Sequence, residues 1–363
     1  MKLGVEAALV DGELVAGDVE VADGQVAAVG LAGGGRGIAA PGFVDLQVNG
    51  FGGVDLLEAD AAGVGEVGEQ LLRTGVTAYQ PTLISGPEER IRAALQAIAA
   101  ARKAGRGATC LGTHLEGPFL SPLHAGAHPR EQLRAPDLGL LRSLLEAGPV
   151  SMVTLAPELP GALELIDELV ARRVCVSLGH SNATAEEARR AFERGARAVT
   201  HLFNAMRPFA HRDPGLAGAA LARADVAVQL IVDGVHLAPE TVLLAWHAAR
   251  GRLAVVSDAV AAAGLGDGVY RLGGVEVHVT SGVCRRADGV LAGSVGTVPE
   301  AVRRLCELGV PLADAVVAAT SVPARILARE DVGRLAPGAP ADLVVLDDRL
   351  DVARVLRAGA EVT

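Results

Sequence analysis

Eight apolar segments rich in β-branched residues alternate with helix-like stretches, and this alternation restricts the possible folds more than any other feature. Parallel strands need a crossover connection between them, and a helix usually supplies it. Eight such units favour a (β/α)8 TIM-like barrel. A doubly wound open sheet is the alternative, but no Gly-x-Gly-x-x-Gly turn follows the first of these strands. The expected strands cover residues 44–48, 76–83, 109–115, 150–155, 174–178, 198–202, 226–232 and 253–256.

The two ends of the chain have a different pattern, with short alternating segments and tight turns such as Asp11-Gly12 and Asp23-Gly24. Residues 341–346 and 352–356 are similar, and such segments predict antiparallel sheet. We expect both ends to form one small β-sandwich domain, residues 1–40 plus 335–363, beside a barrel domain of residues 41–334. A length of 363 residues exceeds what one hydrophobic core usually supports, which agrees with this division.

Two expected helices begin with a capping box, in which a hydroxyl and a carboxylate satisfy free backbone donors reciprocally. The pairs are Ser85 with Glu88 and Thr184 with Glu187. Gly105 follows the first of these helices, where a left-handed residue commonly ends a helix.

Charge and composition exclude several classes of protein. A net charge of −10 argues against a nucleic-acid or anionic membrane surface, and a phosphorylated substrate would need its own basic residues. The four cysteines are scattered without a Cys-x-x-Cys pair, which is typical of free thiols in a reducing cytosol. Asp11 and Glu13 interrupt the N-terminal segment before a secretory apolar core develops. We therefore expect a soluble cytoplasmic protein.

Polar residues stand at the ends of four expected strands: Glu116, His180, His201 and Asp258. Reactive groups of a (β/α)8 barrel gather at the carboxyl ends of its strands, so we expect these four to converge. Two imidazoles, a carboxylate and one open position suit Zn²⁺ or a similar divalent ion. Asp258 is then the candidate general base and acid. Each residue alone could be an ordinary hydrogen-bonded or capping residue, but their joint arrangement favours a metal-dependent hydrolase.

Several motifs resemble the amidohydrolase superfamily and, within it, the family of N-acetylglucosamine-6-phosphate deacetylases. The resemblance runs nearly from end to end, and His-Leu-Glu-Gly-Pro is its most diagnostic part. The motifs are Pro-Gly-Phe-Val-Asp at 41–45, His-Leu-Glu-Gly-Pro-Phe at 114–119, Gly-His-Ser at 179–181, Thr-His-Leu-Phe-Asn-Ala-Met at 200–206, Asp-Gly-Val-His at 233–236 and Ser-Asp-Ala at 257–259.

The resemblance implies hydrolysis of the N-acetyl amide of an amino-sugar phosphate to acetate and glucosamine 6-phosphate. By position in the motifs, Glu116, His180 and His201 would hold the metal. Asp258 would act first as base and then as acid, and His128 would polarise the substrate carbonyl.

The resemblance also implies residues that bind the rest of the substrate. His236 matches a residue that contacts the sugar. Asn204, through the backbone of Ala205, and Arg212 match phosphate-binding positions. A guanidinium suits that task because its planar fork binds phosphate in a bidentate manner. A neighbouring subunit can supply this arginine in the family, so a homodimer is expected.

One departure from the superfamily pattern bears on the number of metal ions. Many amidohydrolases end the first barrel strand with His-x-His, whereas this chain has Gln47 and Asn49 there. Amides are poor ligands for a transition metal, and neither Lys2 nor Lys103, the only lysines, ends a strand to bridge two metals. One branch of the deacetylase family has the same pattern with a single metal. We expect one divalent ion per chain, Zn²⁺ first, with Fe²⁺, Mn²⁺ or Co²⁺ as alternatives.

Four other functions are compatible with parts of this pattern. A cyclic-amide hydrolase or a deaminase would usually need the His-x-His and the bridging lysine that are absent here. The galactosamine analogue of the substrate differs only in the stereochemistry of one sugar carbon. A catalytically silent barrel would have lost a ligand or the acid/base residue, yet all four strand-end residues are present.

Overall fold

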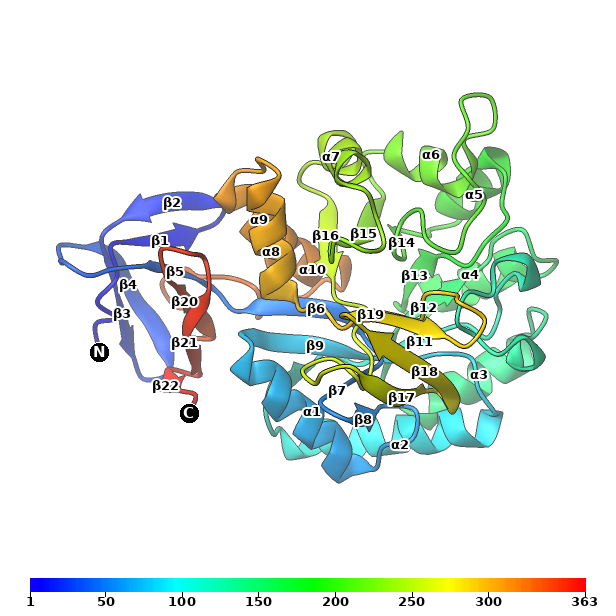
Figure 1. The fold of residues 1–363 in the computed structure, drawn as a ribbon, viewed down its shortest axis with the longest axis horizontal. Helices are drawn as coiled ribbons and strands as arrows, with labels where there is room; N and C mark the ends of the chain where they lie inside the picture. Colours follow the sequence, from blue (N-terminus) through cyan, green and yellow to red (C-terminus); the bar gives the residue numbers. More distant parts are fainter.

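The computed structural model describes residues 1–363. It consists of a parallel β-barrel surrounded by helices and a smaller β-rich unit that contains both ends of the chain (Figure 1). The predicted (β/α)8 barrel with a small β domain is therefore confirmed.

All hydrogen-bonded neighbours in the barrel run parallel. The circle is completed where Val48 bridges Ala259 and the Asn49 amide donates to the Ala259 carbonyl at 2.7 Å. In order around the barrel, the strands are β6 (Phe43–Val48), β9 (Val76–Leu83), a third strand in two pieces, β10 (Thr109–Cys110) and β11 (Thr113–Glu116), then β12 (Val150–Leu155), β13 (Cys175–Leu178), β14 (Ala198–Val199), β15 (Ala227–Ile231) and β16 (Leu253–Val256).

Two barrel strands differ from the expected ranges by more than a shift of one residue at an end. The third strand is interrupted at Gly112, whose φ of +102° and close approach to Ser151 leave no room for a Cβ. The sixth strand ends at Val199 rather than at Leu202, because His201 already has a positive φ and begins an irregular loop. The loop that begins here contains His201, Asn204 and Ala205.

The helices lie outside the barrel, and several begin with a side-chain cap (Figure 1). Asp60 accepts from the Gly63 amide, and Thr184 with Glu187 forms the predicted capping box. The helices are α1 (Ala61–Arg73), α2 (Glu88–Ala104), α3 (Leu138–Ala147), α4 (Ala162–Ala171), α5 (Ala185–Glu193), α6 (Gly215–Leu221), α7 (Pro239–Ala248), α8 (Val298–Glu307), α9 (Leu312–Ala318) and α10 (Ser321–Ile326), with 3-10 turns at Pro122–His124 and Arg130–Gln132. No helix has the length and apolar character needed to cross a membrane.

The smaller unit joins the two ends of the chain in one sheet. Its central contact is the antiparallel pairing of β5 with β20, in which Ala40 faces Val344. Twelve buried residues form a core of its own, separate from the main core around the barrel. The sheet order is β2 (Glu13–Ala16), β1 (Ala7–Val10), β5 (Ile38–Pro41), β20 (Leu343–Leu346), β21 (Val352–Arg357) and β22 (Ala360–Glu361), and β3 (Asp18–Ala22) pairs with β4 (Gln25–Leu31) beside it.

Two β insertions lie beside the carboxyl ends of the barrel strands. They are the hairpin of β7 (Gly50–Phe51) with β8 (Val54–Asp55), and the sheet of β17 (Gly268–Leu272), β18 (Val275–Thr280) and β19 (Val283–Arg286). Asp55 joins the two insertions, because its carboxylate accepts from the Gly273 amide at 2.6 Å. The second insertion therefore has a fixed position relative to the barrel mouth.

Candidate active site

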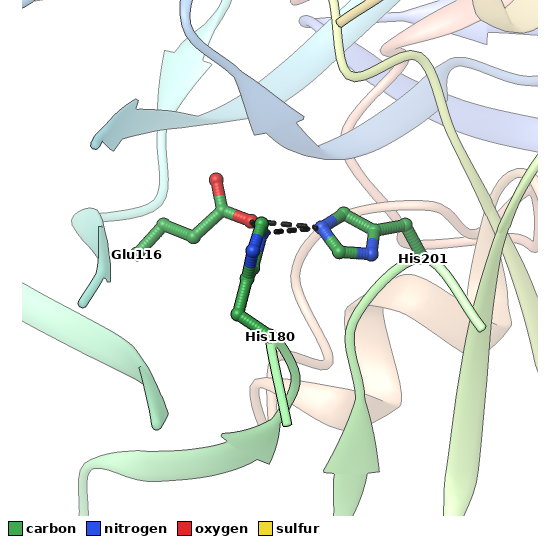
Figure 2. A group of neighbouring side chains, drawn as sticks. All are labelled: Glu116, His180 and His201. Carbon is green, nitrogen blue, oxygen red and sulfur yellow. Dashed lines mark hydrogen bonds and ion pairs between the residues drawn. The ribbon is translucent and has the colours of Figure 1, made fainter. Parts of the chain in front are cut away.

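Three of the predicted strand-end residues meet at one point above the barrel. Glu116 ends β11, while His180 and His201 follow β13 and β14. Figure 2 shows the carboxylate directed toward both imidazoles. Glu116 Oε1 lies 3.1 Å from His180 Nε2 and 2.9 Å from His201 Nε2, and the two nitrogens are 3.1 Å apart. All three side chains are buried, so the cluster is shielded from bulk water.

The backbone at these positions turns the side chains toward the cluster. His180 and His201 have φ values of +48° and +30°, and Asp258 has +51°. Such values are uncommon for residues with a Cβ, and they concentrate at functional sites. Each of the three residues follows the end of its strand by two positions, where the backbone has left the sheet.

The hydrogen bonds of the cluster test whether a cation fits between its members. His180 Nδ1 donates to the His124 carbonyl at 2.8 Å, so its Nε2 carries a lone pair toward Glu116. A lone pair on nitrogen and a carboxylate oxygen at this distance repel each other unless a cation lies between them. Two imidazole nitrogens and one carboxylate oxygen are a donor set for Zn²⁺ and related divalent ions. The residues present therefore fit a metal.

Glu116 is held in its ionised form. Burial acts to raise its pKa, but the surrounding side chains of His128, His180 and His201 outweigh this effect and hold the pKa well below its usual range. A permanently charged carboxylate is what a metal ligand requires.

Asp258 lies beside this cluster, at the end of β16, and lines the same cavity of about 290 Å³. Its Oδ1 accepts from Asn49 Nδ2 at 2.8 Å. Burial raises the pKa of Asp258 to about 8, and the charge of Glu116 acts in the same direction. A carboxyl group with a pKa near neutrality can both take up and release a proton.

His128 borders the cavity from the loop after β11, and its ring orientation is set by Ser85. The Ser85 amide donates to His128 Nδ1 at 3.1 Å, so the ring proton lies on Nε2. Nε2 is 3.8 Å from Glu116 Oε2. Burial lowers the pKa of His128 to about 4, and the nearby His180 adds to this effect. The result is a neutral imidazole with an N–H donor.

The prediction of a capping box at Ser85 was wrong. Helix α2 begins after Pro87 without a side-chain cap, and the Ser85 hydroxyl lies 3.0 Å from His128 Nδ1 instead. The carboxylate of Glu88 pairs with Arg92 on the same helix. The pattern of a capping box is local, whereas the partner of Ser85 comes from a loop more than 40 residues further along the chain.

The two amides that replace His-x-His act as hydrogen-bond donors to carboxylates. Gln47 Nε2 donates to Glu116 Oε1 at 3.2 Å, and Asn49 donates to Asp258 as described. Both amides are buried, and their own oxygens have no partner. The sequence predicted only that Gln47 and Asn49 would not bind a metal, and it gave no indication of these contacts.

The predicted substrate-binding residues divide into two groups. Asn204, Ala205 and His236 line the cavity. His236 Nδ1 is 2.7 Å from the Asp233 carboxylate, which fixes the direction of its ring. Arg212 is exposed in the loop before α6 and does not line the cavity, and neither does any other arginine or lysine. The chain alone therefore presents little positive charge to a phosphate.

Residues near the β17–β19 insertion complete the wall of the cavity. Leu272 ends β17, and Val290 and Leu291 follow β19. Sequence reasoning did not assign these residues to the site. Residues 275–279 alternate as a strand does, but this pattern does not indicate where the strand lies relative to the barrel.

A (β/α)8 barrel with imidazoles and carboxylates gathered at the carboxyl ends of its strands has the architecture of a metal-dependent hydrolase. The family model described as Amidohydrolase family matches residues 38–362, and the chain belongs to this family.

Two relatives with known names are similar in sequence to most of this chain. The chain is 39% identical over 320 residues to an N-acetylgalactosamine-6-phosphate deacetylase of Escherichia coli O157:H7, covering 87% of this chain and 85% of that protein. It is 42% identical over 337 residues to the human N-acetylglucosamine-6-phosphate deacetylase, covering 88% and 81%.

A Mycobacterium smegmatis N-acetyl-D-glucosamine-6-phosphate deacetylase mutant, solved in complex with N-acetyl-D-glucosamine-6-phosphate, superposes with a TM-score of 0.96 at 38% identity. That comparison covers 100% of this chain and 99% of the other. The Thermotoga maritima N-acetylglucosamine-6-phosphate deacetylase gives 0.93 at 34% identity, with the same coverage. The resemblance inferred from the motifs is confirmed.

Proposed function

We propose that this chain hydrolyses the N-acetyl amide of N-acetylglucosamine 6-phosphate, releasing acetate and glucosamine 6-phosphate. The observation that carries the proposal is the convergence of Glu116, His180 and His201 beside Asp258 in one cavity. The names of relatives at about 40% identity support the substrate.

Glu116, His180 and His201 would hold one divalent ion, with Zn²⁺ as the first choice. When bound, the ion supplies Lewis-acid polarisation and makes water more acidic. The donor contacts of Gln47 and Asn49 support a single ion, because both amides already serve carboxylates.

Asp258 would move the proton in both halves of the reaction. As a carboxylate it takes a proton from the attacking water while the new C–O bond forms. As a carboxylic acid it returns that proton to the nitrogen while the C–N bond breaks, so that an amine leaves. A pKa near neutrality supports this double role.

His128 would donate its Nε2 proton in a hydrogen bond to the amide carbonyl oxygen. Negative charge develops on this oxygen as water attacks, and a preorganised donor stabilises it. The contact with Ser85 keeps the proton on the side of the ring that faces the cavity.

Asn204, the backbone of Ala205 and His236 would bind the sugar phosphate within the cavity. The exposed position of Arg212 supports a homodimer in which the second subunit supplies the guanidinium for the phosphate. The four free thiols support a reducing, cytoplasmic location.

The test is acetate release from N-acetylglucosamine 6-phosphate, with metal content measured in the same sample. Parallel reactions contain N-acetylgalactosamine 6-phosphate and unphosphorylated N-acetylglucosamine. We expect turnover of phosphorylated sugar and about one metal ion per chain. Faster turnover of N-acetylgalactosamine 6-phosphate would replace N-acetylglucosamine 6-phosphate as the proposed substrate. The name of the E. coli relative contains the galactosamine sugar phosphate. Turnover of the unphosphorylated sugar at an equal rate would refute the phosphate site.

The Asp258→Asn variant separates catalysis from metal binding. It keeps the size of the side chain, so we expect full metal content and a loss of activity of about 10²–10⁴-fold. Activity near that of the wild type with full metal content would exclude Asp258 as the acid/base residue.

A further inference from the structure

A chain of hydrogen-bonding side chains crosses the interior of the barrel beneath the three-residue cluster. Its five members come from neighbouring strands or strand ends, and each is at most 1% exposed. The proposed reaction uses none of them. The contacts are Thr82 Oγ1 to His114 Nδ1 at 3.4 Å, His114 Nε2 to Thr154 Oγ1 at 2.6 Å, Thr154 Oγ1 to Thr200 Oγ1 at 2.7 Å, and Thr200 Oγ1 to Ser177 Oγ at 2.6 Å.

This series of hydrogen bonds joins the three strands that carry the cluster of Glu116, His180 and His201. His114 lies two residues before Glu116, on the same face of β11, and Thr200 directly precedes His201. Ser177 stands in β13, which leads to His180. Thr154 is paired in register with both Glu116 and Ser177, although β12 contributes no residue to the cluster.

The direction of the hydrogen bonds follows from counting donors. Ser177 Oγ has Thr200 as its only partner, so it must donate to Thr200. Thr200 then donates to Thr154, and Thr154 donates to His114 Nε2. His114 therefore carries its proton on Nδ1. The opposite direction would leave the Ser177 hydroxyl hydrogen buried without an acceptor, which is costly.

We propose that this directed series of hydrogen bonds sets the spacing of the three metal-binding strand ends, with Thr154 as the central positioning residue and His114 as the acceptor from Thr154. The inference rests on the proposed metal ligands. A strand end cannot shift along its neighbours without breaking one of these short contacts, and the ligands move with the strand ends. Groups behind metal ligands commonly control metal affinity in this way.

The experiment measures Zn²⁺ affinity by competition with a chromophoric chelator, without substrate. Thr154→Val keeps the shape of the side chain but removes the hydroxyl at the centre of the chain. Thr113→Val is the matched control, because Thr113 is equally buried, lies in β11 and has a hydroxyl without a partner. We expect Thr154→Val to bind Zn²⁺ about 10–100-fold more weakly. Thr113→Val and the hydroxyl-retaining Thr154→Ser should bind as the wild type does.

Equal Zn²⁺ affinity in Thr154→Val and Thr113→Val would overturn the proposal. If Thr154→Val does not fold, Ser177→Ala removes only the first donor and should weaken Zn²⁺ binding by a smaller factor. Nitrogen-15 shifts of the histidine rings, with His114→Phe identifying the signal, should show an unprotonated Nε2. A proton on that nitrogen would refute the direction of the chain.

The affinity measurement is independent of the substrate. A wild type that deacetylates the sugar phosphate while Thr154→Val binds Zn²⁺ normally would refute the positioning role alone. A wild type without deacetylase activity, with weakened Zn²⁺ binding only in Thr154→Val, would refute the proposed reaction alone.

Discussion

Replacement of Asn49 by alanine should change the pH dependence of the reaction. Asn49 Nδ2 donates to Asp258 Oδ1 at 2.8 Å, and both residues are almost fully buried. A hydrogen bond to a charged group contributes about 1.5–3 kcal/mol, and a pKa unit corresponds to about 1.36 kcal/mol. Because this bond stabilises the ionised carboxylate, its loss should raise the pKa of Asp258 by about 1–2 units.

A higher pKa means that the base form of Asp258 appears only at higher pH. The rising limb of kcat/KM against pH should therefore move upward by about 1–2 units in Asn49→Ala. At pH values below the rising limb, kcat/KM of Asn49→Ala should be about 10–100-fold lower than that of the wild type. At pH values above the limb, this difference should shrink. The assay is initial-rate acetate release across both limbs of the profile, with metal content measured at each pH.

Gln47→Ala is the matched control, because Gln47 offers the same kind of amide to the other carboxylate, Glu116. We expect this variant to alter metal retention while the position of the rising limb stays the same. A rising limb that does not move in Asn49→Ala, or a loss of activity that is equal at every pH, would refute the reasoning.

Three further predictions concern the metal, the pH dependence of stability and the core. Glu116→Gln removes the only carboxylate of the cluster, so bound metal after gel filtration should fall well below one ion per chain; full occupancy by elemental analysis would contradict the ligand assignment. Burial raises the pKa of Asp55 from 3.8 to about 6, so the folded state holds its proton more tightly than the unfolded state does. Asp55 therefore contributes roughly 3 kcal/mol to the free energy of unfolding below pH 4, and this contribution is lost as the pH rises to about 6. The difference in urea unfolding free energy between wild type and Asp55→Asn should show this slope, and a constant difference would contradict it. Phe192→Ala should lower the free energy of unfolding by about 3–5 kcal/mol, because this side chain of α5 is fully buried. A loss below about 1 kcal/mol in urea unfolding would contradict this prediction, because it would mean that the surrounding core collapses into the space.

The barrel and the metal cluster could be predicted because their signals are repeated and local. Each strand is a short apolar run, and the polar residue that ends it stands next to it in the sequence. Glu116, His180 and His201 therefore converge once the closed barrel is assumed, since the fold brings strand ends together. The end of the sixth barrel strand was predicted at Leu202 because the apolar pair Leu202 and Phe203 follows soon after Val199, but the backbone has already turned at His201.

Contacts between distant segments could not be predicted in the same way. Ser85 supports His128 rather than a helix start, and Asn49 contacts a residue about 200 positions away. The β17–β19 insertion is recognisable as strands, yet its place above the cavity depends on contacts such as that of Asp55 with Gly273. These details depend on tertiary packing, which spacing along the chain does not encode.

The pairing of β5 with β20 has a consequence for synthesis in the cell. The two strands are about 300 residues apart, so the first half of the small sheet leaves the ribosome long before its partner exists. At a synthesis rate of about 5–20 residues per second, this interval is roughly 15–60 s. During it, β5 presents an unpaired edge of buried apolar character, and such edges can pair with other chains. The yield of folded protein should therefore depend on translation speed and on chaperones that cover β5 until β20 has been synthesised.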